Sequence, residues 1–140
     1  MDSFFQDYKT LAVLGLSRNP KSFSRNAYDF LQKEGYQLYP VNPKGEDAEG
    51  INFFSSLDDV PPVEGAVFFT SPEVSKELIS HCAAKNIRNL WFQLGSIDES
   101  GLVKARNLGL NAKKSCVFLH HPNSGFPHNI HRAINNLLGK

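Results

Sequence analysis

The sequence predicts an α/β fold in three layers, in which helices cover both faces of a doubly wound, mostly parallel sheet of about five strands. Short apolar runs of strand length alternate with amphipathic helical patterns along the chain. Most residues of these runs are apolar, without regular alternation with polar ones, which is typical of strands that are covered on both faces. Such an alternation forms right-handed βα units. A chain of 140 residues is long enough to bury a core, and we expect one domain over 1–140.

Five apolar runs are the expected strands. They occupy residues 10–16, 36–41, 65–70, 89–94 and 115–120. Between the second and third, residues 52–61 predict a short strand or turn followed by one helical turn. The large aromatic residues of these segments are expected in the core rather than stacked on a cofactor; they are Trp91, Phe53 with Phe54, and Phe68 with Phe69.

Two helices are marked by their end signals. The first is expected over 24–34, with Gly35 in the position after its C-terminus. Ser71 and Pro72 predict the N-cap and the first residue of the second. The apolar stripe predicted for this second helix consists of Val74, Leu78, Ile79 and Cys82.

Two further helices follow towards the C-terminus. Ser96 and Glu99 match the S-x-x-E capping box of a helix that stops at Gly109. Its apolar residues are Leu102, Ala105 and Leu108. The last helix is expected from near Pro127.

Composition restricts the class of partner. The chain is 41% hydrophobic and 21% charged with a net charge of +1, which gives no reason to expect a nucleic acid or an anionic membrane as partner. No apolar run approaches the roughly 18 residues of a membrane span, and the N-terminus lacks the basic region of a signal peptide. Cys82 and Cys116 are too few for a disulfide framework. We therefore expect a cytoplasmic protein.

The turn after the first strand is a candidate anion site, because ligands of such sheets bind beyond the carboxyl ends of the strands. Gly15 permits a tight turn and a close approach of phosphate. The dinucleotide pattern G-x-G-x-x-G stops there, since Ser17 and Pro20 occupy the later glycine positions. The Ser17 hydroxyl and the N–H groups of the next helix suit an anion, and basic residues surround them: Arg18, Lys21 and Arg25. A plain turn with solvated basic residues remains the alternative.

The end of the second strand argues against plain NAD. An NAD site places an acidic residue there for the ribose hydroxyls, whereas this chain has Asn42, then Pro43 and Lys44. A lysine beside the ribose suits a ligand with an additional phosphate on that sugar, and both NADP and coenzyme A carry one. A simple turn with a solvated Lys44 is the alternative.

Four motifs together resemble the small CoA-binding-domain family in order and spacing. They are AVLGLSRNPKSFS, YQLYPVNPKGE, LWFQLGSIDESGLVKARNLGL and SCVF. The resemblance covers roughly residues 10–118 and implies a Rossmann-like fold, similar to the nucleotide-binding domain of succinyl-CoA synthetase α subunits. G-x-S alone is a weak signal, but its occurrence with P-V-N-P and W-x-Q-x-G is much more specific.

The resemblance implies coenzyme A as the ligand, held at four places. The implied residues are Gly15, Ser17, Arg18 and Lys21 for the pyrophosphate; Asn42, Pro43 and Lys44 for the adenosine and its ribose phosphate; Ser71 and Pro72 for the adenine or the start of the pantetheine; and Gln93 and Gly95 for the pantetheine arm. Cys116 matches a cysteine that often follows the last strand in the family. The chain departs from the family at Lys114 and Ser115, where an Asp or Asn followed by Arg is common, and in the segment after Cys116.

Metal and thiol chemistry are less well supported. The four histidines near the C-terminus, His120, His121, His128 and His131, have no metal-binding spacing, so we expect no metal site. Cys116 and His120 would be roughly 13 Å apart on an extended strand, too far for a nucleophile and its base. A buried structural cysteine is therefore expected, with a mixed disulfide to the thiol of coenzyme A as an alternative.

These observations predict a stand-alone protein, such as a carrier, sensor or accessory subunit, that binds coenzyme A or an acyl-CoA and catalyses no reaction of its own. No Walker-type motif or G-x-S-x-G elbow occurs in the chain. Two alternatives remain open: an NADP-linked oxidoreductase or its nucleotide-binding half, and an empty scaffold for protein–protein contact. The general frequency of homodimers makes a homodimer the expected assembly.

Overall fold

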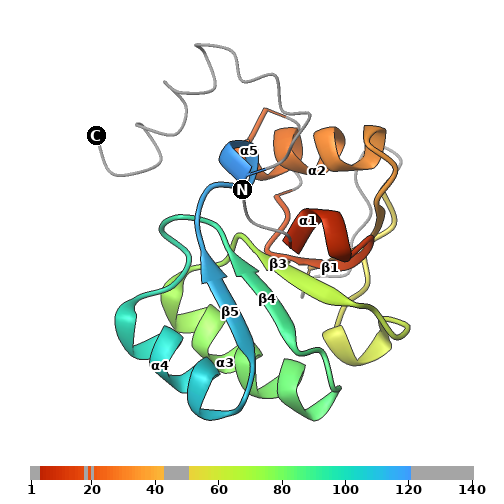
Figure 1. The fold of residues 1–140 in the computed structure, drawn as a ribbon. Coiled ribbons are helices and arrows are strands. Elements are labelled where there is room, and N and C mark those ends of the chain that lie inside the picture. Colours follow the sequence, from red (N-terminus) through yellow and green to blue (C-terminus); the bar gives the residue numbers. More distant parts are fainter. Residues whose placement is uncertain (1–3, 18, 20, 43–50, 121–140) are drawn as a thin grey trace.

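The computed structural model describes residues 4–17, 19, 21–42 and 51–120 of the chain. Its centre is a five-stranded sheet in which every neighbouring pair is parallel (Figure 1). In spatial order the strands are β2 (Gln37–Val41), β1 (Thr10–Leu14), β3 (Gly65–Phe68), β4 (Asn89–Phe92) and β5 (Asn111–Lys114). The prediction of a Rossmann-like α/β fold with a parallel sheet is confirmed.

The register brings three strand ends to one level. Leu14, the last residue of β1, pairs with Val41 of β2 and with Phe68 of β3. The chain passes from β1 to β2 on one side and from β2 past β1 to β3 on the other, so the winding direction changes between β1 and β3. Ligands of open parallel sheets bind at such a switch point, beyond the carboxyl ends of the strands.

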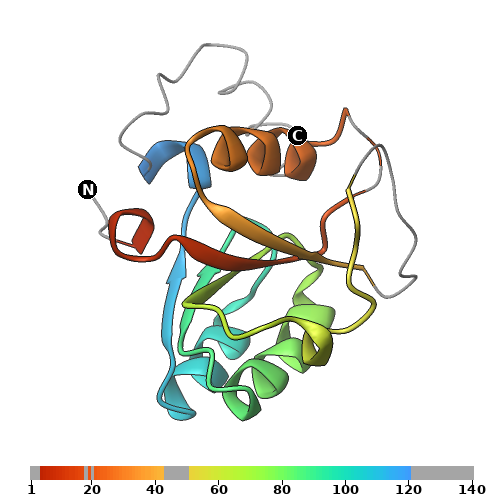
Figure 2. The same cartoon turned by 90° about the vertical axis from the view of Figure 1, so that its right-hand side faces the viewer.

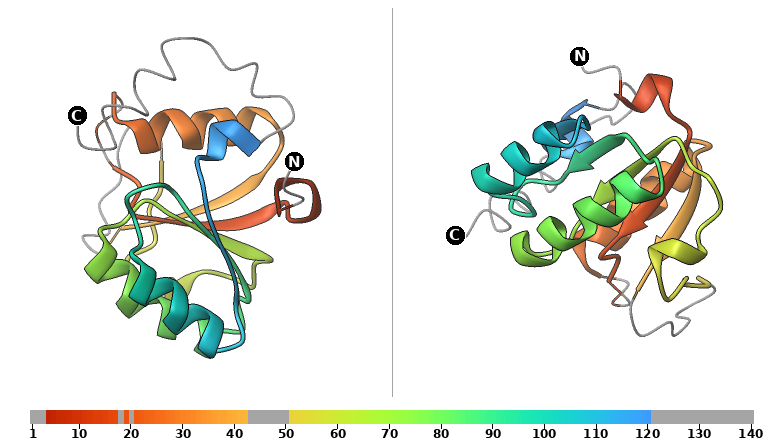
Figure 3. Two further views of the ribbon diagram at one scale, coloured as in Figure 1. Left: turned by 60° about the vertical axis from the view of Figure 1, so that its left-hand side comes forward. Right: turned by 90° about the horizontal axis from the view of Figure 1, so that it is seen from below.

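Helices cover both faces of the sheet, as Figures 2 and 3 show. One face carries α1 (Phe4–Asp7), α2 (Phe23–Lys33) and α5 (Val117–His120). The other carries α3 (Pro72–Ala84), α4 (Glu99–Asn107) and the 3-10 turn η1 (Leu57–Asp59).

Side-chain alternation along the strands fills both layers of the core. In β1, Ala12 and Leu14 pack towards α3 and α4, whereas Leu11 and Val13 pack towards α1 and α2. Trp91, Phe68 and Phe53 are buried, as predicted for core aromatics, whereas Phe54 and Phe69 are only half-buried. The Trp91 indole Nε1 donates a hydrogen bond to the Ser115 carbonyl at 3.1 Å, so its polar atom is satisfied without a ligand.

The prediction for the fifth strand is wrong. The strand is Asn111–Lys114, and the apolar residues assigned to it form α5 instead. β5 lies at the edge of the sheet and buries only Ala112, so it has no apolar run. Val117 is buried among the residues of the α1 and α2 layer because the chain turns back over that layer. The short helix α1, with Phe4 and Phe5 in the core, had no separate signal in the sequence.

The helix starts are partly as predicted. Ser71 is the N-cap of α3 and Pro72 its first residue. The capping box is wrong, because the N-cap of α4 is Asp98, which accepts a hydrogen bond from the Gly101 N–H at 2.9 Å. Ser96 is instead buried in the preceding turn.

Two residues of the predicted apolar stripes are on the surface. Val74 is 42% exposed and Leu108 is 46% exposed. Leu108 is the C-cap of α4, so it lies beyond the last residue of the helix and not on its buried face. The turn expected within 52–61 is confirmed by a bridge between Val41 and Phe54 and by η1. The helix expected near Pro127 lies outside the described residues.

Candidate functional site

Gly15 directly follows β1 at the switch point and packs against Phe69 and Thr70, which directly follow β3. It has a positive φ of +83°, and a Cβ added there would lie 2.7 Å from Thr70 Cγ2 and 2.9 Å from the Phe69 carbonyl carbon. The position therefore requires glycine for both its backbone conformation and its packing. The space where a side chain would lie is filled by Thr70 and the Phe69 backbone, and Gly15 itself lines two cavities.

The loop after Gly15 is held by its own side chains. The Ser17 N–H donates to Ser24 Oγ, the Asn19 N–H to Ser17 Oγ, and the Lys21 N–H to Asn19 Oδ1, each at 3.0 Å. These oxygens satisfy backbone N–H groups that a glycine-rich loop would leave open. The absence of further glycines is thus compatible with an ordered turn.

Hydrogen-bond donors gather at the start of α2. Ser22 is its N-cap and accepts from the Arg25 N–H at 3.2 Å, while the hydroxyls of Ser22 and Ser24 are 3.3 Å apart. Helix geometry leaves the N–H groups of Phe23 and Ser24 without intrahelical partners. Among the described residues the Ser17 hydroxyl acts only as an acceptor, so its hydrogen can donate to a ligand. This set of donors suits an anion.

Gln93 brings a further donor from the end of β4. It is 2% exposed, and its Oε1 accepts a hydrogen bond from the Val117 N–H at 3.0 Å. That bond orients the amide, and Nε2 is buried without a hydrogen-bond partner among the described residues. A buried amide donor with no partner is unfavourable by about 1–3 kcal/mol, so an acceptor from a ligand would stabilise it.

Gln93 and the α2 donors share one cavity, which we call the smaller cavity. Its volume is about 250 Å³. It is lined by Gly15, Ser17, Ser22, Phe23, Ser24, Phe69, Gln93 and Leu94. Polar groups from β1, α2 and β4 thus meet beside the apolar surfaces of two phenylalanines and a leucine.

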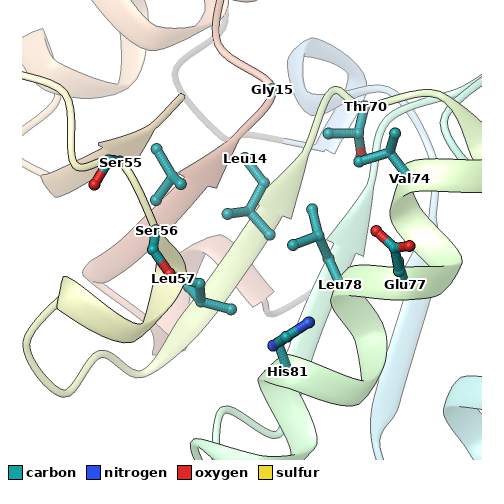
Figure 4. A pocket seen from close by; sticks show the side chains of 11 residues that line it. Leu14, Gly15, Ser55, Ser56, Leu57, Thr70, Val74, Glu77, Leu78 and His81 are labelled. Atoms are coloured by element: carbon teal, nitrogen blue, oxygen red, sulfur yellow. The ribbon is translucent and has the colours of Figure 1, made fainter. Parts of the chain in front are cut away.

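A second cavity, the larger cavity, lies on the other side of Gly15 and is shown in Figure 4. Its volume is about 400 Å³. It is lined by Leu14, Gly15, Val41, Ser55, Ser56, Leu57, Thr70, Val74, Glu77, Leu78 and His81. Most of its wall is aliphatic, and the exposed position of Val74 is explained by its place in this wall. Thr70 is held by a short hydrogen bond between its hydroxyl and that of Ser75, 2.5 Å away.

The structure brings three of the predicted site residues together. Gly15, Ser17 and Gln93 all line the smaller cavity, and Gly15 also lines the larger one. Lys21 is exposed on the loop between β1 and α2, but it lines neither cavity.

The other predicted residues lie around the cavities. Asn42 follows Val41, and its N–H donates to the Phe54 carbonyl at 2.9 Å. Ser71 caps α3, and Pro72 begins it, between the lining residues Thr70 and Val74. Gly95 is exposed with a φ of +89°. Arg18, Pro43 and Lys44 lie outside the described residues.

Sequence reasoning missed most of the larger cavity. Ser55, Leu57 and Leu78 come from η1, its preceding turn and α3. The one available signal was Val74, an apolar residue in the first turn of a helix whose buried side continues through Ile79 and Cys82.

In the described part of the chain, the cysteines form no disulfide and no metal site includes a cysteine or histidine. Cys82 and Cys116 are both free and fully buried, and burial raises the pKa of the Cys82 thiol to about 12. Within residues 4–17, 19, 21–42 and 51–120 there is no group of three His, Cys, Asp or Glu side chains that could hold a metal ion. None of the helices in these residues combines the length and the apolar character needed to cross a membrane. Three of the clustered histidines, His121, His128 and His131, lie outside the described residues.

Comparison with known proteins decides the family. The family model described as CoA binding domain matches residues 9–122, most of the chain. The chain belongs to the CoA binding domain family. The matched region contains both cavities and every residue that lines them.

Relatives with this domain differ in length. The chain is 25% identical over 103 residues to the alpha subunit of ADP-forming acetate–CoA ligase II from Pyrococcus furiosus, a match that covers 72% of this chain and 22% of the ligase subunit. It therefore spans about a fifth of that relative. It is 28% identical over 105 residues to the uncharacterized protein YneT of Bacillus subtilis, covering 74% of this chain and 78% of YneT.

A solved structure from Thermus thermophilus has a similar fold. It is 25% identical in sequence with a TM-score of 0.77, and the match covers 87% of this chain and 94% of that one. The chain thus resembles both small proteins of its own size and one part of a much longer ligase subunit.

Proposed function

We propose that this protein binds coenzyme A or an acyl-CoA and catalyses no reaction of its own. The observation that carries the proposal is the position of Gly15 between the two cavities. One cavity is rich in hydrogen-bond donors, and the other is mainly aliphatic. A ligand that occupies both cavities therefore needs an anionic group for the donors at the start of α2 and an arm that accepts hydrogen bonds in the smaller cavity. Its other end has to fit the mainly aliphatic larger cavity.

The donors at the start of α2 would hold the pyrophosphate. They are the Ser17 hydroxyl, one hydroxyl of the Ser22 and Ser24 pair, and the first N–H groups of α2. Hydrogen bonds to a charged phosphate oxygen are stronger than those to neutral acceptors. The positive end of the helix dipole adds to the attraction, and Lys21 is exposed on the same loop.

The pantetheine arm would continue through the smaller cavity past Gln93. Its two amide carbonyls are acceptors, and the buried Gln93 Nε2 offers the matching donor. Phe23, Phe69 and Leu94 provide apolar surface for the methylene and methyl groups of the arm.

The adenosine would occupy the larger cavity. Val41 lines this cavity at the end of β2, and the chain then continues to Asn42, Pro43 and Lys44. We propose that Lys44 pairs with the phosphate on the ribose. Free thiols such as Cys82 and Cys116 suit the reducing cytoplasm that the sequence predicts.

The relatives support this proposal without extending it to catalysis. A CoA ligase subunit contains a domain like this one, and YneT matches it over most of its own length. The second domain and the partner subunit that ligase chemistry of the succinyl-CoA synthetase type requires are not needed for binding.

Isothermal titration calorimetry of the full chain tests the proposal. CoA and acetyl-CoA are expected to bind more tightly than NAD and NADP. The absence of heat with every CoA species up to millimolar concentration would overturn it, and selective binding of NADPH would favour the oxidoreductase alternative. Mass spectrometry of the denatured protein should also find CoA that co-purified with it.

A substitution separates the ribose phosphate from the rest of the ligand. Lys44→Ala is expected to weaken CoA more than dephospho-CoA, because only CoA carries the phosphate that Lys44 would bind. Lys33→Ala is the matched control, because it removes a positive charge at the C-terminal end of α2 from a residue that lines neither cavity. Equal losses for the two ligands in Lys44→Ala would reject the assignment.

A further inference from the structure

The larger cavity has two ionisable side chains, both from α3. Among the described residues that line it, Glu77 and His81 are the only titratable ones. They are four residues apart, which places them one above the other on the same side of the helix. Figure 4 shows both side chains on the cavity side of α3, with the Leu78 side chain between them.

The surroundings of this pair are mainly aliphatic. Leu14, Val41, Leu57, Val74 and Leu78 form most of the wall, the hydroxyl side chains of Ser55, Ser56 and Thr70 add to it, and no described Lys or Arg lines the cavity. Sites for flat organic groups have this composition, in which apolar walls hold the ring and a few polar groups select its orientation and identity.

The chemistry of the pair matches one edge of a 6-aminopurine. An ionised carboxylate only accepts hydrogen bonds, and the imidazole of His81 can donate from a ring N–H. A 6-aminopurine has an amino donor next to a ring-nitrogen acceptor, so the amino group suits Glu77 and the ring nitrogen suits His81. A 6-oxopurine has a carbonyl oxygen in place of the amino group, which would face the carboxylate without a hydrogen between them.

We propose that Glu77 and His81 select a 6-aminopurine over a 6-oxopurine in the larger cavity. This rests on the proposed function, since coenzyme A supplies the base. Glu77 is the specificity-determining residue, because its carboxylate rejects the oxygen of the wrong base as well as binding the amino group of the right one. Sites that hydrogen-bond a specific polar group of the ligand discriminate strongly against analogues that lack it.

The test compares CoA with its analogue in which hypoxanthine replaces adenine. The wild-type protein is expected to bind CoA roughly tenfold more tightly, the size expected of one hydrogen bond to a charged group. Glu77→Gln should bring the ratio close to one, because the amide can donate to the oxygen of hypoxanthine. Glu73→Gln changes an exposed acid of α3 that does not line the cavity, and it should keep the wild-type ratio.

The outcomes separate this inference from the proposed function. If the wild-type protein binds neither ligand, both are overturned. If it binds CoA and the analogue equally, or if Glu77→Gln keeps the wild-type ratio, base selection by Glu77 is overturned and CoA binding stands. His81→Phe is a second check and should weaken CoA while leaving the unfolding transition near that of the wild type, since His81 is exposed.

Discussion

Gly15 and Thr70 touch so closely that only a hydrogen fits on the Gly15 α-carbon at the face towards Thr70. A Cβ there would be 2.7 Å from Thr70 Cγ2. This contact joins the end of β1 to the end of β3 and places the bare backbone of Gly15 between the smaller and the larger cavity. A larger residue at position 15 would therefore disturb the contact between the two strand ends and the walls of both cavities.

Gly15→Ala is therefore expected to reduce both stability and CoA binding. A positive φ alone costs a non-glycine residue about 1–2 kcal/mol, and the collision with Thr70 and the Phe69 backbone adds to this. Gly35→Ala is the matched control, because Gly35 has a φ of +95° but nothing within 4 Å of an added Cβ. Urea denaturation should show a clearly larger loss for Gly15→Ala; equal losses would mean that the contact with Thr70 is unimportant.

Ser22→Ala should lower both helix stability and ligand affinity. It removes the N-cap of α2, which costs about 1 kcal/mol, and one hydroxyl of the smaller cavity. Asp98→Ala removes the N-cap of α4 far from that cavity. We expect both variants to be less stable in urea and only Ser22→Ala to bind CoA more weakly by calorimetry. An equal loss of affinity in both would indicate a general effect of destabilisation.

Replacement of Gln93 distinguishes the two ends of the ligand. Gln93→Met keeps an unbranched side chain of similar length but removes the Nε2 donor. CoA is expected to bind more weakly to this variant, whereas adenosine 3′,5′-bisphosphate, which has no pantetheine, should bind as it does to the wild type. Calorimetry with both ligands gives the comparison. Equal weakening of both would place the effect of Gln93 on the fold, through its hydrogen bond to Val117.

Acid should destabilise the protein partly through Asp98. The Gly101 N–H, followed by Lys76 and Ser100, lowers the pKa of the Asp98 carboxyl from 3.8 to about 2. The folded state therefore favours the ionised form, and this contribution is present above about pH 4 and is lost as the pH falls towards 2. Urea midpoints measured between pH 5 and pH 2.5 should fall less steeply for Asp98→Asn than for the wild type.

Glu64 is a second carboxyl group whose pKa is lowered in the folded protein, so its contribution to stability should also be lost in acid. Its pKa is lowered by the backbone N–H groups of Lys9 and Thr10, at the opposite end of the sheet from the cavities. Glu64→Gln should likewise reduce the acid slope, and the double variant should add the two effects, since distant sites are additive. Wild-type slopes in both variants would contradict these assignments.

The two native thiols should be unreactive in the folded protein. Burial raises the pKa of Cys82 to about 12, so almost no thiolate is present at pH 8, and Cys116 is fully buried. Ellman's reagent should label both only after urea is added. Ser80→Cys, on an exposed position of α3, is the positive control and should react at once. Rapid labelling of the native wild type would contradict the burial of these residues.

β1, β3 and β4 could be predicted because both faces of each are covered. Residues such as Val13, Phe68 and Trp91 are buried on either side of the sheet, so their strands consist of unbroken apolar runs. β2 and β5 are the two edge strands, but β2 still buries Pro40 and Val41, whereas β5 buries just Ala112 and has a polar pattern. The next apolar run, with Val117 and Phe118, therefore has the stronger strand pattern although it forms α5.

The polar half of the candidate site was easier to predict than the apolar half. Gly15, Ser17 and Gln93 each follow a strand directly, and parallel strands bring such positions to one edge. Leu57 and Leu78 are aliphatic residues that would suit any core, and only the packing of η1 beside α3 leaves a cavity between them. Nothing in their spacing distinguishes a cavity wall from a filled interior.

The polar character of β5 also bears on association between copies of the chain. Parallel sheets grow when an uncovered strand offers its backbone to another chain, and charged side chains on that strand oppose the growth. Lys113 and Lys114 are exposed on β5, so two molecules meeting along this edge would bring four ammonium groups together. The homodimer that the sequence predicts is therefore expected to form through a different surface.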